Sequence, residues 1–466
     1  MTQVAPTSRP LSLGAAVVLA LGALDFGLEQ SIILPALPSL AQHYAASIVA
    51  VSWLATAFLL AAAVAVPLFG RLGDLVGKKR MILVSLAAFA LGSLLCAVSS
   101  SIGLAIAGRA LQGFGAAVAP LTLGLARDMV APSDMPRTVG VVIGAANVGG
   151  GLGFLLSGVL VDAFSPAAIF WFLFIAGAVL ALGVAALAPE SPVRAQASLD
   201  LLGTALLGTG LVSLVLAVSE GVAWGWTSVE VIALFAGSAA ALALFAATER
   251  RTREPIVDLH LIARRPFVST NLCAFAFGFG FFVAVFVIPQ IAASPEATGY
   301  GLGLSVTKVG LLLVPTSVAG MIGGWAGGRT LERLGPRAQV SLGALIGVAG
   351  YLSLALVHDT ALALASGSAA IGLAWGLILT GIYPLVLRTA GMDRTSISAA
   401  IVLVFRNTGV SVGVTVSAVV IAGAGLAGQF RDEAGFTRAF LIGAAGAVAA
   451  FLLAAWLPRR APAQPA

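Results

Sequence analysis

The chain has 466 residues, of which 59% are hydrophobic and 9% are charged, and its formal net charge is +6. A soluble globular domain carries about 25% charged residues, so this composition excludes one and predicts an integral membrane protein. Cys96 and Cys273 fall in different apolar segments, which offers neither a disulfide framework nor a metal site. We therefore expect no metal or other cofactor. We also expect no nucleic-acid partner, because membrane topology explains the excess of basic residues.

Apolar stretches of about 20 residues recur along the chain, and this is the length that an α-helix needs to cross about 30 Å of hydrocarbon. We count fourteen, at about residues 13–38, 49–69, 81–99, 103–129, 139–161, 167–188, 201–219, 229–247, 267–292, 309–327, 340–357, 361–387, 397–423 and 439–457. The first stretch lacks the pattern of a cleaved signal peptide and is interpreted as a span. The predicted fold class is therefore an all-α polytopic membrane protein with 14 transmembrane helices.

Basic residues are distributed unevenly between the segments that connect these stretches. If the N-terminus is cytoplasmic, most of the 25 Lys and Arg residues lie in cytoplasmic segments, whereas Lys308, Arg431 and Arg438 face outward. The positive-inside rule then predicts that both termini are cytoplasmic. We expect the protein in the cell (plasma or inner) membrane, surrounded by membrane lipids.

A short pattern of glycine and charged residues occurs twice, 258 residues apart. The matched pairs are Gly70 and Gly328, Arg71 and Arg329, Asp74 and Glu332, Gly77 and Gly335, and Lys79 and Arg337. Six spans with their loops take about 190 residues, so the spacing predicts two related six-helix bundles with two inserted central helices. The expected domains are residues 1–190, 191–250 and 251–466, and such repeated halves are typical of transporters.

The first copy of the repeat predicts a conformational latch, formed by the residues Gly70, Arg71, Asp74, Gly77 and Arg80. Its glycines allow a sharp turn and a close approach of helices, and its acid can form salt bridges with the neighbouring bases. Such contacts can hold one half against the other. The alternative is a basic cytoplasmic loop, which explains the charges but leaves the repeated glycines unexplained.

Three motifs resemble known signatures: residues 70–80 after the second span, residues 109–115 in the fourth span and residues 28–33 in the first. They are similar to those of the major facilitator superfamily, and in particular of its fourteen-span drug:proton antiporter (multidrug efflux) branch. The resemblance implies a secondary active transporter that exports small lipophilic or cationic compounds by alternating access. It further implies coupling to protons and function as a monomer. In this resemblance Glu29 occupies the usual acidic position of the first span, and Arg109 is associated with proton coupling.

The fifth span departs from the antiporter signature, because residues 153–158 lack its Gly-Pro pair. The superfamily assignment does not depend on that pair, but antiport does. A transporter of the same fold that exports a lipid or glycolipid, or a symporter, remains an alternative. Gly149, Gly153 and Ser157 still form a stripe of small residues, and we expect it to pack at the interface between the two halves.

Asp25 and Glu29 are one helical turn apart in the first span and share one helix face. A charged side chain at this depth costs about 3 kcal/mol or more unless it is paired, protonated or hydrated, so the pair indicates a proton or ion site. The helical rise of 1.5 Å places Glu29 and Arg109 at similar depths. The alternative interpretation is a pair of acids that line a hydrated vestibule and carry no proton.

Our mechanistic hypothesis is that Glu29 and Asp25 take up protons from outside and that Arg109 modulates Glu29. Protonation then releases substrate and favours the inward-facing state. Arg406 and Asn407 in the thirteenth span belong to the opposite half, and together with Gln112 they are predicted to contact the other half or the substrate. A purely structural bridge between helices is an equal alternative for Arg406.

The ninth span is rich in phenylalanine and predicts an aromatic wall for a small-molecule substrate. The residues assigned to this substrate pocket are Phe275, Phe279, Phe282 and Gln290. Phenylalanine that faces lipid explains the composition equally well. Acids beside aromatic rings suit lipophilic cations, and the same cavity would serve a lipid.

Two other classes of protein fit the sequence less well. The three histidines lie in predicted loops and no span carries a nucleophile with a plausible base, so we expect no enzyme. A sensor or scaffold that transports nothing would leave the charges inside the membrane without a purpose.

Overall fold

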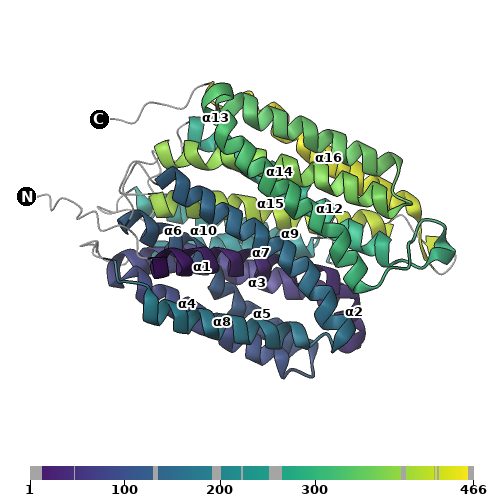
Figure 1. Cartoon of the computed structure of the whole chain (residues 1–466), viewed down its shortest axis with the longest axis horizontal. Helices are drawn as coiled ribbons and strands as arrows, with labels where there is room; N and C mark the ends of the chain where they lie inside the picture. The colour runs from purple at the N-terminus through teal and green to yellow at the C-terminus, as the bar shows by residue number, and fades with distance from the viewer. Residues whose placement is uncertain are drawn as a thin grey trace, which may run out of the picture.

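The computed structural model describes residues 13–46, 48–129, 135–191, 201–221, 224–250, 265–389, 395–423, 426–427 and 430–459 (Figure 1). Long helices dominate this part of the chain, and the strands β1 (Leu426–Ala427) and β2 (Phe430–Arg431) form one minimal antiparallel hairpin. Thirteen of the described helical segments are long and apolar enough to cross a membrane, and Leu202–Val218 is a shorter apolar helix. The predicted polytopic all-α fold with fourteen helical spans is thus confirmed.

The first half of the chain forms a bundle of its own, drawn in purple to blue in Figure 1. Its elements are α1 (Leu13–Ser31), η1 (Leu34–Ala36), α2 (Leu37–His43), α3 (Ile48–Val76), α4 (Lys78–Ala97), α5 (Ile102–Gln112), η2 (Gly113–Ala117), α6 (Val118–Met129), α7 (Met135–Ala163) and α8 (Ala168–Leu187). The second half, drawn in green to yellow, lies beside it. Its elements are α12 (Arg265–Ala293), η3 (Glu296–Thr298), α13 (Val306–Leu356), α14 (Ala361–Thr389), α15 (Thr395–Gly423) and α16 (Glu433–Ala454).

Two of the predicted spans are interrupted helices. The first span changes to a 3-10 turn at η1 and resumes as α2, and a proline stands at the start of each of these two elements. Proline has no N–H to donate and its ring crowds the preceding turn, so a continuous α-helix cannot pass through these positions unchanged. The fourth span passes from α5 through the 3-10 segment η2, which contains two glycines, into α6.

The inserted helices α9 (Leu201–Glu220) and α10 (Val229–Glu249) pack against each other, and the Ser238 hydroxyl donates a 2.8 Å hydrogen bond to the carbonyl of Gly210. Helix α9 contacts α3 of the first half and α15 of the second. The inserted pair therefore lies along the seam between the halves.

The repeated motif produces the same backbone turn in both halves. Gly77 has φ 125° between α3 and α4, and Gly335 has φ 76° where α13 is broken. Each glycine also lies against the chain that follows the last helix of its half: a Cβ at Gly77 would lie 2.7 Å from an oxygen of Glu190, and one at Gly335 would meet the carbonyl of Arg459. Only glycine adopts such a φ freely, so the repeat in sequence marks an equivalent turn in structure.

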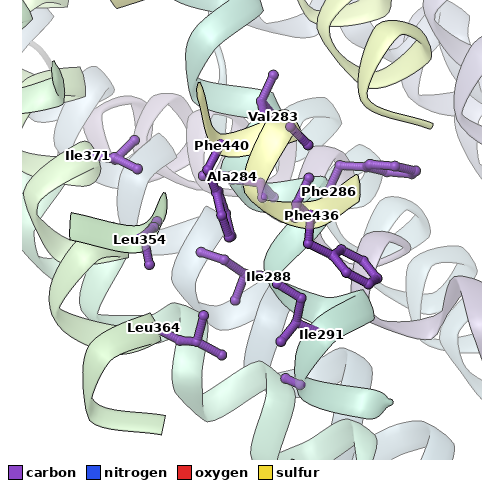
Figure 2. Close-up of a cluster of buried hydrophobic side chains, with 14 of the residues drawn as sticks. Val283, Ala284, Phe286, Ile288, Ile291, Leu354, Leu364, Ile371, Phe436 and Phe440 are labelled. Carbon is purple, nitrogen blue, oxygen red and sulfur yellow. The ribbon is translucent and has the colours of Figure 1, made fainter. Parts of the chain in front are cut away.

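The core of the second half is a tightly packed apolar cluster, shown in Figure 2. Helix α12 contributes Val283 and Ile288, and α16 contributes Phe436 and Phe440, all at most 1% exposed. Leu34 of η1 and Phe154 of α7 join this cluster from the first half. The aromatic ninth span is therefore largely a core element, buried on most of its sides.

The stripe of small residues on α7 does not face the other half, which corrects our expectation. A Cβ at Gly149 would lie 2.7 Å from the carbonyl carbon of Leu24, and Gly153 lies against the Leu28 carbonyl, so the stripe packs on α1 within the first half. The neighbouring residues Gly151 and Gly158 face α13 instead. The reason is the 100° turn between successive helix positions, which gives α7 two glycine faces, one for α1 and one for the second half.

Candidate functional site

Arg109 lies at the centre of a buried hydrogen-bond network in the first half. Its Nε donates to the Leu54 carbonyl at 2.9 Å and its Nη1 donates to Gln112 Oε1 at 2.6 Å. Gln112 Nε2 donates to Ser93 Oγ at 2.6 Å, and Ser93 donates in turn to the Phe89 carbonyl at 2.8 Å. Because a guanidinium has no acceptor, the amide oxygen of Gln112 must face Arg109. The network therefore fixes the direction in which the arginine points.

The two acids of α1 are both buried, and Glu29 lies within the electrostatic influence of this arginine. Glu29 is 2% exposed and Asp25 is 8% exposed. Glu29 interacts electrostatically with both Asp25 and Arg109, yet its Oε1 is buried without a hydrogen-bond partner. Arg109 directs its recorded hydrogen bonds to Leu54 and Gln112 instead. A buried carboxyl oxygen without a donor is costly for the ionised form, so this position is suited to a group that holds a proton in part of its working cycle.

A central cavity lies beside Arg109, between the two halves, and encloses about 690 Å³ of empty space, including the part that is open to the outside. From the first half it is lined by Gln30, Leu34, Leu37, Ala55, Thr56, Phe58, Leu59 and Arg109. From the second half it is lined by Phe282, Phe286, Asn407, Val410, Ser411, Val414 and Thr415. A ligand in this space would touch both bundles at once, and its occupancy would depend on how they are oriented.

One of the four predicted pocket residues lines the central cavity. Phe282 lines the central cavity, whereas Phe275, Phe279 and Gln290 are not among its lining residues. A Cβ at Gly446 of α16 would lie 2.6 Å from the Phe279 ring. This ring therefore packs inside the second half.

Arg406 and Asn407 occupy adjacent positions on α15. Asn407 lines the cavity, and its Oδ1 accepts hydrogen bonds from Nε and Nη2 of Arg406 at 3.3 and 3.1 Å. Arg406 is 6% exposed, and its guanidinium carbon lies 5.7 Å from the centre of the Trp375 ring. Of the residues predicted to contact the other half or substrate, Asn407 therefore reaches the cavity directly, Arg406 lies behind it, and Gln112 lies behind Arg109.

Sequence reasoning missed two contributions to this region. Thr56 and Phe58 of α3 line the cavity, and the Phe58 ring lies 4.6 Å from the guanidinium carbon of Arg109. Trp375 of α14 packs on the aromatic residues of α12, with its ring centre 4.0 Å from that of Phe281. No sequence signal joined α14 to α12.

The predicted latch residues make their recorded contacts within the first half. Asp74 Oδ1 pairs with Lys78 Nζ at 3.2 Å, and Arg80 Nε lies 3.8 Å from Glu190 Oε2. The Lys79 amide also donates to Glu190 at 3.2 Å. These contacts hold the turn between α3 and α4 against the end of α8. A latch between the halves, formed by Gly70, Arg71, Asp74, Gly77 and Arg80, stays a prediction.

Replacing Gln112 with Ala should lower the thermal unfolding midpoint in detergent, because it removes both the acceptor for Arg109 and the donor for Ser93. We expect a loss of about 1–3 kcal/mol for the buried polar groups left unpaired. Ser93→Ala removes only the far end of the network and is the matched control, with a smaller loss expected. Equal midpoints for Gln112→Ala and the unaltered protein would show that the network contributes nothing to stability.

A hydrogen bond joins the two halves at the end of α7. The N-cap residue of α13, Ser305, makes no capping bond of its own, and Asp162 of α7 accepts the Thr307 amide hydrogen at 2.9 Å instead. An N-cap contributes about 1 kcal/mol. Here the bond also joins one half to the other, so Asp162→Ala should favour separation on this side by roughly fivefold.

The measurement is the rate at which a thiol reagent added from that side modifies a cysteine placed at Thr56 in the cavity. The native Cys96 and Cys273 are buried and give little background. Asp162→Asn is the matched control, because Asn caps helices about as well as Asp. If Asp162→Ala and Asp162→Asn react at the same rate, the contact does not hold the halves together.

Two helical bundles that enclose a cavity lined from both sides define the class of this protein as a multi-pass membrane transporter. The sequence profile of the Major Facilitator Superfamily matches residues 19–414, and the chain belongs to this family. Transporters of this kind act on small molecules, typically as monomers, and are in general not enzymes. They generally need no cofactor, and the described residues include no group of His, Cys, Asp or Glu that could hold a metal ion.

Among the relatives that the chain matches, one is named as an export protein and another as a multidrug transporter. A tetracenomycin C resistance and export protein of Streptomyces glaucescens is 27% identical over 414 residues, which cover 87% of this chain and 75% of the relative. The multidrug transporter protein MdtP of Bacillus subtilis is 26% identical over 371 residues, which cover 78% and 67%. The crystal structure of the human organic anion transporter MFSD10 covers 96% of this chain and 100% of its own, with a TM-score of 0.69. The two sequences are 18% identical, so this similarity shows a shared fold alone.

Proposed function

We propose that the protein exports small lipophilic compounds from the cytoplasm in exchange for protons, by alternating access of the central cavity. The observation that supports this most directly is the lining of one cavity by residues of both halves, next to buried acids. Rocking of two halves about a shared site exposes that site to each side of the membrane in turn. The related tetracenomycin C resistance and export protein supports the direction of transport, and the related multidrug transporter supports small organic compounds as substrates.

Proton coupling is assigned in this proposal to Glu29, with Asp25 as a second acceptor and Arg109 as the modulating charge. Glu29 is buried, lacks a partner for Oε1 and lies in the electrostatic field of Arg109. A proton taken up at Glu29 from outside removes a negative charge beside the arginine. After the substrate has left, this change shifts the equilibrium between the outward-facing and inward-facing states and permits the return to the inward-facing state.

We also propose a domain organisation and an orientation in the membrane. Residues 1–190 and 251–466 act as the two moving bundles, residues 191–250 form the inserted pair, and both termini lie in the cytoplasm of a cell whose plasma or inner membrane holds the protein. The positive-inside rule supports this orientation.

Transport in proteoliposomes under an imposed pH gradient tests the proposal. Purified protein is reconstituted, and a panel of lipophilic aromatic dyes and a fluorescent lipid are followed while the gradient is set in either direction or absent. We expect dye movement that follows the gradient and disappears when a protonophore collapses it. Movement of lipid alone would favour a lipid exporter of the same fold, and dye uptake in the same direction as protons would favour a symporter.

A further inference from the structure

The charge that faces the central cavity is positive. Among the described residues that line it, Arg109 is the only ionisable one. Asp25 and Glu29 are buried on α1 outside the lining, and Arg406 adds a second positive charge directly behind Asn407. The sequence led us to expect small lipophilic or cationic substrates, the cationic ones because acids beside aromatic rings suit cations. The structure instead brings an arginine to the cavity wall and leaves both acids behind it.

Polar side chains from both halves bring hydrogen-bond donors to the cavity. Arg109 uses Nε and Nη1 in its recorded hydrogen bonds, which leaves Nη2 outside the network. Arg406 can only donate, so Asn407 must turn its oxygen toward Arg406, and its amide nitrogen takes no part in that pair. Gln30 Nε2 is buried without a hydrogen-bond partner. A ligand with acceptor atoms would satisfy these donors, whereas a cationic ammonium group, quaternary or protonated, has no acceptor to offer them.

The rest of the cavity wall is aromatic and aliphatic. Phe58 lies beside Arg109 from the first half, and Phe282 and Phe286 line the cavity from the second. Such walls favour a flat aromatic body, because ring pairs gain from stacked and edge-to-face contact as well as from burial. An anion in this low-dielectric site also gains charge-assisted hydrogen bonds, while a cation is repelled by Arg109.

We propose that the central cavity selects acidic aromatic compounds, with a carboxylate or phenolate on the Arg109 guanidinium, and excludes permanent cations. The inference rests on the proposed transport function and names the substrate class of the same site. Arg109 and Gln30 of the first half hold the acidic end, Asn407 of the second half completes the ring of donors, and the phenylalanines hold the aromatic body.

Equilibrium binding of three matched probes to the full-length protein in detergent tests this selectivity. The probes are anthracene-9-carboxylate, the neutral anthracene-9-carboxamide and the quaternary (anthracen-9-ylmethyl)trimethylammonium cation, all followed by fluorescence near neutral pH. We expect the carboxylate to bind most tightly, with an advantage over the cation of about tenfold or more. Equal binding of carboxylate and cation, or a preference for the cation, would overturn the proposal.

Two variants locate the selectivity in the cavity. Arg109→Gln should remove the preference for the carboxylate, and Gln30→Glu should reverse it in favour of the cation by placing a negative charge on the wall. Gln30→Glu leaves the Arg109 network intact, so it keeps the test valid if Arg109→Gln fails to fold. Arg333→Gln, at an exposed position on α13, is the control and should behave like the unaltered protein. An unchanged preference in Gln30→Glu would contradict the assignment.

This binding assay needs no pH gradient, so it separates the two proposals. Glu29→Gln should retain or increase the preference for the carboxylate, because it takes away a negative charge that interacts with Arg109 and leaves the residues that line the cavity unchanged. If dye transport proves independent of protons while carboxylate selectivity holds, the coupling proposal fails and the substrate class stands. If transport is coupled but cations bind best, the substrate class fails alone.

Discussion

Replacing Glu29 with Gln is expected to abolish transport driven by a pH gradient while the protein stays folded. Gln has nearly the same shape as a protonated Glu, so the packing around this buried side chain is preserved. It cannot gain or lose a proton, and it carries no charge to set against Arg109. The variant should therefore be locked in the proton-loaded condition, with proteoliposome uptake along the gradient falling to the level of empty vesicles.

The controls for Glu29→Gln separate coupling from binding and folding. Exchange of labelled for unlabelled substrate without a gradient uses only the steps in which the transporter carries substrate. No proton is gained or lost in those steps, so exchange should persist. Glu220→Gln changes another buried glutamate, at the end of α9 and away from the cavity, and should transport normally. Asp25→Asn should leave part of the activity if Asp25 is the second acceptor. Undiminished gradient-driven transport in Glu29→Gln would remove Glu29 from the mechanism.

The sequence was sufficient to predict the fold because its main signals are local. Apolar length determines which segments are spans, and the two copies of the glycine and charge motif indicate the two halves. Gly77 and Gly335 then adopt the same left-handed backbone region. Arg109 was also predictable as a site residue, since an arginine inside a span must find partners and does so in Leu54 and Gln112.

The wall of the cavity was less predictable, because it depends on where neighbouring helices of the second half pack closely and where they separate. Phe275, Phe279, Phe282 and Phe286 are spaced by three or four residues and so share one face of α12. At the level of Phe275 and Phe279, however, Gly409 and Gly413 bring the backbone of α15 against α12 and close the space. One or two turns further along, at Phe282 and Phe286, the space is open. Helical periodicity predicts which residues share a face of α12, but it does not predict at which level along the helix that face opens onto the cavity.

The position of α1, the helix that carries both acids, should depend on its contact with α7. Gly149→Ala is the sharpest test of that dependence. A Cβ at this position would collide with the Leu24 carbonyl on α1, one residue before Asp25. Because the obstacle is backbone, α1 must move as a unit and carry Asp25 and Glu29 with it. We expect a loss of about 1–3 kcal/mol from overpacking, together with a marked loss of proton-driven transport.

Gly144→Ala on the same helix is the matched control, since a Cβ there would meet nothing within 4 Å. Both substitutions gain the same helix propensity of about 0.5–1 kcal/mol over glycine, so the difference between their unfolding midpoints in detergent isolates the contact with α1. Gly144→Ala should be as stable as the unaltered protein or slightly more stable, and fully active. If Gly149→Ala matches it in both measurements, the acids are not held in place by the contact between α1 and α7. Their position would then have to come from the Arg109 side of the site.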